Sequence, residues 1–345
     1  MGRLNIRALA KKILPEFVQK RIRVLLRNRL PRSVRLKAST LCQLNCKSCY
    51  MRKFNSGTMG TGYLTFSDFQ KFIQNNKFVK HIELSNSGEI FLNPDLILIL
   101  KYAFENNIKL SAYNGVNFNT VSDEIIEALV KYRFRSMTVS IDGASQEIYS
   151  LYRVNGNIYT VMENIEKLNK FKQKYKSQFP ELVWQYILME HNECDIVKAK
   201  EMAKQLQMKI VFKLTWDPGY YPKNAAMVRK ETGLNYLSNE EAVEKEGREY
   251  AIMTICHQLW TCPQINWDGR LLGCCGIFTD DFGVNVFETG LKKAINSENY
   301  RYAKRMLEGK IDVKKNTKNI PCVNCHSYKM MKETGKYMKI DKKLP

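Results

Sequence analysis

Short apolar runs alternate with amphipathic segments through residues 34–216. Six runs have the length and the branched or aromatic content of buried strands, and they cover residues 34–40, 81–87, 109–115, 135–141, 182–189 and 209–216. Helical spacing of apolar residues fills the intervals, in a segment that begins near Ser67 and in residues 94–106, 121–132, 158–174 and 195–206. Since parallel strands need such crossovers, the pattern predicts an α/β fold: a partial (β/α)6 TIM-like barrel spanning residues 34–216, with its chemistry at the carboxyl ends of the strands.

The alternation of strands and helices ends after residue 216. Residues 217–250 contain two prolines and a charged helical stretch, and we interpret them as a linker. Residues 251–330 are expected to form a small C-terminal domain, with a hairpin that turns at Asp268-Gly269 and a helix over 297–309. Residues 331–345 form a basic tail.

Residues 1–33 predict a basic, amphipathic, helical N-terminal extension. Leu9, Ile13 and Phe17 recur at a spacing of four, with Lys and Arg between them. Such a segment can lie peripherally on an anionic membrane surface, at the inner membrane face. It can equally pack its apolar stripe against the barrel, and both interpretations stay open.

The formal net charge of +21 is concentrated in the two ends of the chain. Residues 1–37 hold 12 basic residues and one acid, residues 301–345 hold 13 basic residues and four acids, and residues 38–300 are almost neutral. Nucleic acid is therefore not the expected partner, because no interleaved aromatic residues accompany the basic ends. No stretch reaches the roughly 18–20 apolar residues that span a bilayer, and the N-terminus lacks a signal core, so we expect a cytoplasmic protein.

Three of the ten cysteines follow the first predicted strand, in the spacing Cys42-x3-Cys46-x2-Cys49. Three thiolates cannot complete a four-coordinate zinc site without a fourth ligand. They can hold a [4Fe–4S] cluster and leave one iron open to a ligand that brings its own amino and carboxylate groups. A zinc loop or a set of buried thiols is the alternative.

With CQLNCKSCY over 42–50, the sequence resembles the radical S-adenosylmethionine (SAM) superfamily, whose signature is CxxxCxxC followed by an aromatic residue. Further motifs follow at successive strand ends: SGE in place of the family's GGE, YNG in place of TNG, SIDG, and a later Tyr and Arg. The resemblance implies that SAM contacts Tyr50, Ser87, Gly88, Glu89, Asn114, Ser140, Asp142, Arg153 and the backbone of Leu188. It also implies reductive cleavage of SAM to a 5′-deoxyadenosyl radical, with a flavodoxin or ferredoxin as electron donor.

The later cysteines show a second pattern. Two cysteines on the side of the predicted hairpin and two in a CxxC motif can together provide the four ligands of one site. This arrangement resembles the auxiliary-cluster domains of radical enzymes called SPASM and twitch. The resemblance implies one auxiliary [4Fe–4S] cluster on Cys256, Cys274, Cys322 and Cys325. Cys275 can replace Cys274, Cys262 can also be a ligand, and a zinc ribbon is the alternative. Cys194 is expected to be an ordinary buried thiol.

The substrate is the least constrained part of the prediction. The layout resembles radical enzymes that act on sugars, aminocyclitols and surface polysaccharides, which favours a polar small molecule. An auxiliary cluster would accept electrons in a dehydrogenation, whereas an epimerisation needs a hydrogen-atom donor such as Cys262 or Cys275. Modification of a peptide or protein and modification of RNA are the alternatives.

Overall fold

A computed structural model of the chain describes residues 30–53, 60–215, 217–246, 255–277, 280–311 and 319–338. The predicted N-terminal extension therefore lies almost entirely outside the described residues. So does the end of the predicted basic tail, from residue 339 onwards. Within the described residues, no helix is long and apolar enough to cross a membrane.

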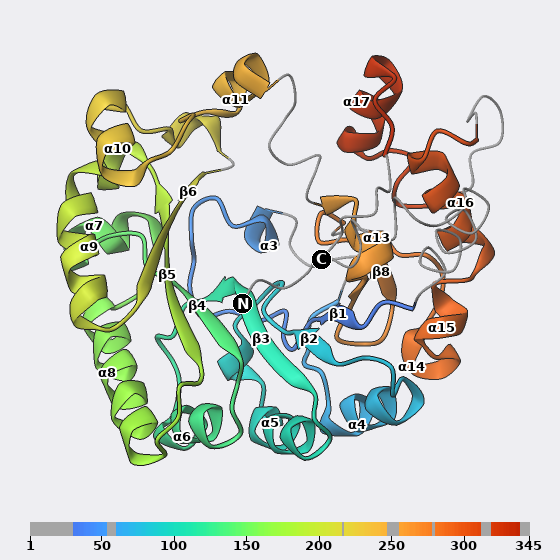
Figure 1. Ribbon diagram of the computed structural model, residues 1–345, viewed down its shortest axis with the longest axis horizontal. Helices are drawn as coiled ribbons and strands as arrows, with labels where there is room; N and C mark the ends of the chain where they lie inside the picture. Colours follow the sequence, from blue (N-terminus) through green and yellow to red (C-terminus); the bar gives the residue numbers. More distant parts are fainter. Residues whose placement is uncertain are drawn as a thin grey trace, which may run out of the picture.

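The fold is built on one open sheet of eight strands in the order β6-β5-β4-β3-β2-β1-β7-β8 (Figure 1). Every neighbouring pair is parallel except β7 and β8. The strands are β1 (Ser33–Leu36), β2 (His81–Glu83), β3 (Lys109–Val116), β4 (Ser136–Ser140), β5 (Glu181–Leu188), β6 (Lys209–Leu214), β7 (Gln264–Ile265) and β8 (Leu271–Gly273). The α/β prediction of a partial barrel is confirmed, since the sheet does not close.

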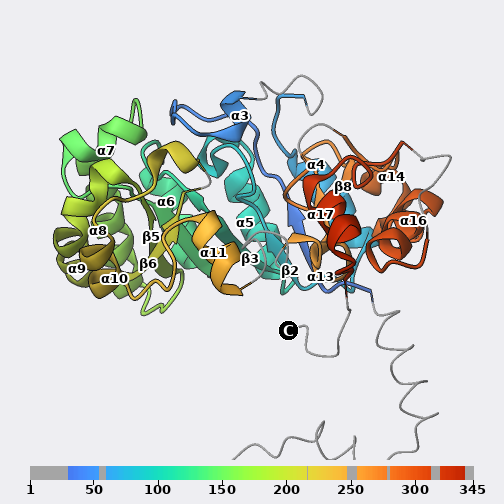
Figure 2. The same ribbon diagram turned by 90° about the horizontal axis from the view of Figure 1, so that it is seen from above.

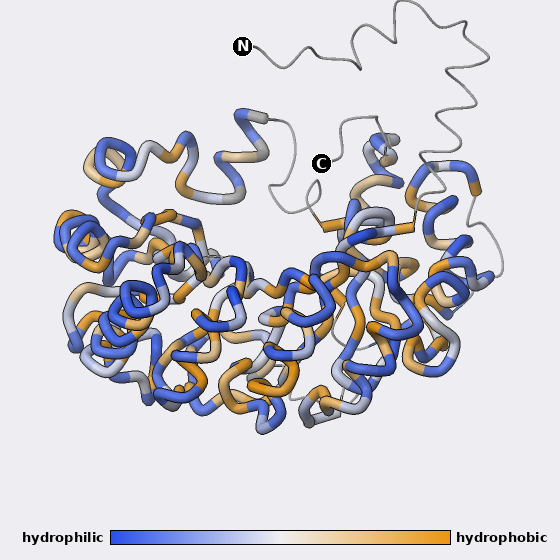
Figure 3. The backbone as a smooth tube through the Cα atoms, turned by 60° about the horizontal axis from the view of Figure 1, so that its bottom comes forward, coloured by the Kyte–Doolittle hydropathy of each residue, from blue (hydrophilic) through white to orange (hydrophobic). Residues whose placement is uncertain are grey.

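Helices connect the parallel strands and lie along the outer side of the curved sheet (Figures 1 and 2). They are α4 (Phe66–Asn75), α5 (Leu96–Glu105), α6 (Asp123–Lys131), α7 (Gln146–Tyr152), α8 (Ile158–Lys174) and α9 (Ile196–Gln205). Polar N-caps begin several of them: the Thr65 and Ser122 hydroxyls and the Asn157 amide oxygen accept backbone N–H bonds of α4, α6 and α8. Hydrophilic and hydrophobic residues alternate along these helices, as amphipathic packing requires (Figure 3).

Two of the predicted strands extend four residues past the ends that the structure gives them. The first ends at Leu36 rather than at residue 40, because the chain turns to pair Ser39 with Tyr63. The second ends at Glu83 rather than at residue 87. The segment after β6 also contains more structure than a linker needs, with α10 (Ala225–Thr232) and α11 (Asn239–Glu246).

The C-terminal hairpin extends the barrel sheet. Strand β7 pairs with β1, and the Arg35 and Leu36 positions register with Gln264 and Ile265. Short helices surround the hairpin: α13 (Gln258–Thr261), α14 (Val286–Thr289), α15 (Leu291–Ala294), α16 (Glu298–Leu307) and α17 (His326–Thr334). The hairpin therefore places the later cysteines beside the first strand of the barrel.

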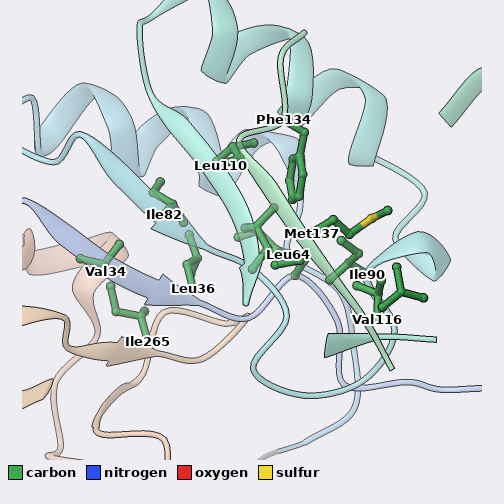
Figure 4. Close-up of a cluster of buried hydrophobic side chains, with 14 of the residues drawn as sticks. Val34, Leu36, Leu64, Ile82, Ile90, Leu110, Val116, Phe134, Met137 and Ile265 are labelled. Carbon is green, nitrogen blue, oxygen red and sulfur yellow. The ribbon is translucent and has the colours of Figure 1, made fainter. Parts of the chain in front are cut away.

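The two faces of the sheet differ in chemistry. Val34, Leu36, Ile82, Leu110 and Ile265 are buried in one apolar core that includes the helices, and their side chains lie close together in Figure 4. Side chains alternate along a strand, so the intervening positions point to the inner face of the barrel. These positions carry polar groups, and they are Arg35, Lys37, Glu83, Ser111, Gln185 and Gln264.

Candidate functional site

The loop after β1 carries the first three cysteines. Cys42 is exposed, Cys46 is buried and Cys49 is half-buried. A turn joins the last two, with Cys49 N donating to Cys46 O at 3.2 Å. Burial raises the pKa of Cys42 to about 11, although a backbone hydrogen bond at Leu44 opposes this; the charges of Glu89, Cys46 and Cys49 raise it further. The three thiols are therefore close enough to influence one another electrically.

Two side chains donate hydrogen bonds to the sulfurs of this loop. Asn117 Nδ2 lies 3.5 Å from Cys42 Sγ. Arg153 Nη1 lies 3.5 Å from Cys46 Sγ. Burial raises the pKa of Cys46, and the Arg153 guanidinium opposes that rise. Such N–H donors stabilise thiolate character, which iron ligation requires.

The cysteine loop fits an iron–sulfur cluster better than a single ion. Among the described residues, no three His, Cys, Asp or Glu side chains converge tightly enough to hold one metal ion. A [4Fe–4S] cluster takes each thiolate on a different iron, so its ligands lie farther apart than those of a mononuclear site.

Gly88 and Glu89, in the turn after β2, contact the segment that leads into the cysteine loop. Gly88 has φ +64°, and a Cβ there would lie 2.7 Å from Ser39 O and 2.8 Å from Leu41 O. Glu89 N donates to Leu41 O at 2.7 Å. The Glu89 carboxylate is buried and accepts from Asn117 N at 2.6 Å. Burial raises the Glu89 pKa to about 7, although hydrogen bonds from backbone N–H groups such as that of Asn117 oppose the rise. Gly88 and Glu89 of the predicted SGE motif therefore hold the start of the cysteine loop in place through backbone contacts.

Tyr50 and Asn114 converge on the turn after β2. The Tyr50 hydroxyl donates to Asn86 O at 2.6 Å, and burial raises the Tyr50 pKa. Asn114 Nδ2 donates to Asn86 Oδ1 at 2.6 Å. Ser87 is buried in the same turn. Asn86 is thus shared by two residues predicted to contact SAM.

Asp142 and Arg153 form a buried ion pair at the end of β4. Asp142 Oδ2 accepts from Arg153 Nε and Nη2, both at 2.6 Å, and Asp142 Oδ1 accepts from Ile187 N at 2.7 Å. Burial lowers the pKa of Arg153, but the charges of Asp142 and Cys46 outweigh it and hold that pKa above its ordinary value. The pair therefore links β4 and β5 to the cysteine loop.

Ser140 and Leu188 are both buried near this pair. Ser140 Oγ accepts from Gln185 Nε2 at 3.4 Å, and it lies where a Cβ on Gly115 would be. Gly115 has φ +113°, which explains the glycine in the YNG turn. Leu188 is fully buried as a whole residue, its backbone included.

Four of the later cysteines influence one another and lie together. Cys256, Cys274 and Cys322 are buried. Burial raises the pKa of Cys256 to about 12, and Cys325 and Cys275 raise it further. Burial also raises the pKa of Cys274, as do Cys322, Cys275 and Cys256. Cys256 lies just before α13, Cys274 directly after β8, and Cys322 and Cys325 in the turn before α17, and these thiols are near enough for their charges to interact.

Cys275 and Cys262 each contact a polar side chain, which is Gln258 for Cys275 and Arg35 for Cys262. The Gln258 side chain brackets Cys275, with its Oε1 accepting from Cys275 N at 2.8 Å and its Nε2 at 3.2 Å from the sulfur. Cys262 is half-buried, and burial raises its pKa to about 11 although Arg35 hydrogen-bonds to it and opposes this. Glu83 and Cys275 raise that pKa further. Cys262 therefore lies beside the polar inner face of the barrel.

The prediction of a buried Cys194 is wrong, because this thiol is exposed. It lies in a short 3-10 helix, Glu190–Asp195, in which Asn192 turns inward instead. Asn192 Nδ2 donates to Ile187 O at 2.9 Å. The Asn192 amide thus provides a hydrogen-bond partner for a buried backbone carbonyl, and Cys194 lies on the side of the turn that faces solvent.

Sequence reasoning also missed several polar residues of the inner face. Arg35 and Glu83 lie in the first two strands, Lys37 directly follows the first, and Asn117 follows the third. Arg35 and Lys37 carried a signal, because charges at alternate positions of a buried strand indicate a polar face. Asn117 carried none, since its contact to Cys42 depends on the third dimension.

Residues 36–203, about half of the chain, match the model of the radical SAM superfamily. A curated relative is 27% identical over 178 residues, which is 51% of this chain and 48% of the relative; it is an AdoMet-dependent heme synthase from Methanosarcina barkeri. The chain thus aligns with about half the length of that relative.

Solved structures share the fold over most of the chain. SuiB from Streptococcus suis bound to S-adenosylmethionine has a TM-score of 0.61 at 15% identity, covering 94% of this chain and 79% of SuiB. The anSMEcpe structure with bound AdoMet has a TM-score of 0.53 at 16% identity, covering 79% of this chain and 82% of anSMEcpe.

Proposed function

We propose that this chain, whose residues 36–203 match the radical SAM superfamily, is a radical enzyme that abstracts hydrogen from a polar, carbohydrate-like small molecule. Dehydrogenation or epimerisation is the outcome. The family match supports a radical SAM enzyme with SAM and one [4Fe–4S] cluster as cofactors. The observation that carries the proposal is the three-thiol loop at the end of β1, with Asn117 and Arg153 donating to its sulfurs.

Cys42, Cys46 and Cys49 would hold the cluster. When bound, the cluster and SAM supply a one-electron cleavage that yields a 5′-deoxyadenosyl radical able to abstract hydrogen from an unactivated C–H bond. The protein's own part is to position and to exclude water. Gly88 lets the turn after β2 approach the loop, and Arg153 orients Cys46 while Asp142 fixes its guanidinium. A flavodoxin or ferredoxin is the electron donor we propose.

A second [4Fe–4S] cluster on Cys256, Cys274, Cys322 and Cys325 belongs to the proposal. The mutual influence of these thiols supports it, and Cys274 is favoured over Cys275 because it is buried beside Cys256 and Cys322. A site with four protein thiolates has no open position, so its role is electron transfer. Zinc on the same ligands is the alternative that metal analysis must test.

The polar substrate is supported by the inner face of the barrel. Arg35 Nη1 donates to Asn86 Oδ1 at 2.7 Å, and Lys213 Nζ donates to Gln185 Oε1 at 2.6 Å. Burial lowers the pKa of Lys213, and the charge of Arg35 lowers it further, so these two cations of the inner face are near enough to interact. An apolar substrate would cover this polar face without offering hydrogen bonds in return, at a cost of about 1–3 kcal/mol for each polar group left unsatisfied.

Anaerobic incubation of the reconstituted protein with SAM, dithionite and candidate sugars or aminocyclitols tests the proposal. We expect 5′-deoxyadenosine, formed faster with a true substrate. In D2O, an epimerase introduces solvent deuterium into its product through an exchangeable donor, whereas a dehydrogenase yields an oxidised product without it. Absence of 5′-deoxyadenosine from protein with a full complement of iron would refute the proposal.

A peptide substrate is the second candidate. The SuiB structure with a TM-score of 0.62 is bound to its precursor peptide SuiA, and at 15% identity this likeness extends to the fold alone. A small precursor peptide encoded beside this protein, and its conversion in the same assay, would favour the peptide over the sugar.

A further inference from the structure

Three buried side chains on the inner face of the barrel have polar atoms without hydrogen-bond partners among the described residues. They are Lys37 Nζ, both amide atoms of Gln264, and Asn86 Nδ2. Lys37 and Gln264 are 0% exposed and Asn86 is 7% exposed. Buried polar groups are normally paired, so a group of three such residues points to a ligand.

These residues lie together. Gln264 on β7 is in register with Arg35 on β1, and Lys37 follows two positions later on the same face. Arg35 Nη1 donates to Asn86 Oδ1 at 2.7 Å, which brings Asn86 to the same patch. We call Lys37, Gln264 and Asn86 the inner-face patch.

The carboxylates nearest the patch are already engaged. Glu83 Oε1 accepts from Ser85 N at 2.9 Å and from Tyr113 N at 3.1 Å, and Glu83 Oε2 lies 3.9 Å from Arg35 Nη1. Asp268 accepts from Arg270 Nε at 2.8 Å and from Asn266 Nδ2 at 2.9 Å. Among the described residues, the Lys37 ammonium therefore has no carboxylate within ion-pair distance.

The patch lies near Tyr50 and near Cys262. Asn86 O accepts from the hydroxyl of Tyr50, which directly follows Cys49. Arg35 also hydrogen-bonds to the Cys262 thiol. A substrate held at the patch would therefore lie near both Tyr50 and Cys262.

We propose that the inner-face patch binds an anionic group of the substrate, a carboxylate or a phosphate. Lys37 contributes the positive charge, and the amide N–H groups of Asn86 and Gln264 donate to the remaining oxygens. The free atoms hold more donors than acceptors, and an oxyanion supplies the missing acceptors. This inference rests on the proposed function and narrows its substrate to an anionic, carbohydrate-like molecule.

Isothermal titration of the anaerobically reconstituted full chain tests the patch. The probes are inorganic phosphate, glucose 1-phosphate, glucuronate and, as the neutral control, glucose. We expect one anionic class to bind and glucose not to bind, and the two sugar anions distinguish phosphate from carboxylate. Lys37→Met should weaken the anionic probe by about tenfold or more, while Lys209→Met, at an exposed lysine of β6, should leave it unchanged.

Gln264→Glu provides a second variant if Lys37→Met does not fold, since a carboxylate in the patch should repel the same probe. Equal binding of glucose and the anions, or wild-type affinity in the folded variants, would overturn the inference. Formation of 5′-deoxyadenosine by the wild-type protein is measured separately. Cleavage of SAM without anion binding refutes the patch alone, and absence of cleavage refutes the proposed function.

Discussion

Replacing Lys37 by Met should stabilise the folded protein at neutral pH while removing the proposed anion site. Burial lowers the pKa of Lys37 from 10.5 to about 8; the nearby Asp268 opposes this fall, and Arg270 adds to it. The side chain is 0% exposed, so little solvent screening reduces the effect. A fall of that size corresponds to about 3 kcal/mol of folding free energy that the charged lysine costs the protein.

The pH dependence gives the sign of this effect. Between about pH 8 and pH 10.5 the folded protein binds fewer protons at Lys37 than the unfolded chain does, so wild-type stability rises with pH through that window. Below about pH 8 the full penalty is present. Methionine fills a similar volume without a charge, so the variant should gain most at pH 7 and progressively less above pH 8.

Urea unfolding of the apo protein, followed by circular dichroism under anaerobic conditions at pH 7 and pH 9.5, measures this difference. Lys209→Met serves as the control, because that lysine is exposed and should change little at either pH. A Lys37→Met variant that is less stable than wild type at pH 7, or whose stability difference is the same at both pH values, would refute the reasoning.

Four further predictions concern the cysteine sites and their supports. Anaerobic reconstitution should give about eight irons per chain, and the triple Ala variant of Cys42, Cys46 and Cys49 should keep about four; zinc in place of iron contradicts this. Iron analysis of Cys274→Ala should show loss of the auxiliary cluster, whereas Cys275→Ala should retain it, because Cys274 is the buried neighbour of Cys256 and Cys322. Asp142→Ala and Arg153→Ala should each weaken SAM binding by about 1–3 kcal/mol. Arg153→Ala should also shift the absorption of the cluster, because Arg153 contacts Cys46. Unchanged SAM affinity in both variants argues against these roles. Gly88→Ala should reduce iron incorporation at the first site, since its Cβ would lie 2.7 Å from Ser39 O, and an iron content equal to wild type would show that the turn can adjust.

The amino-acid sequence by itself determined the elements and their order. Strands and helices alternate with clear periods, so the parallel barrel could be predicted, and α8 begins and ends at the predicted residues 158 and 174. The spacing of Cys42, Cys46 and Cys49 is local, and local spacing is readable without coordinates. Strand ends were less well predicted, because the turn after Leu36 depends on the bridge between Ser39 and Tyr63.

Only the tertiary structure decided which distant residues share a site. Arg153 reaches Cys46 across 107 positions, and Asn117 reaches Cys42 across 75. The pairing of β7 with β1 brings Gln264 beside Arg35, although a long stretch of chain separates them. Local propensity carries no information about such contacts, because they arise when strand order and side-chain alternation place separate segments on one face of the sheet. The same geometry buries Lys37 completely on that face, whereas the predicted strand over residues 34–40 indicates only that its charge shares a face with Arg35.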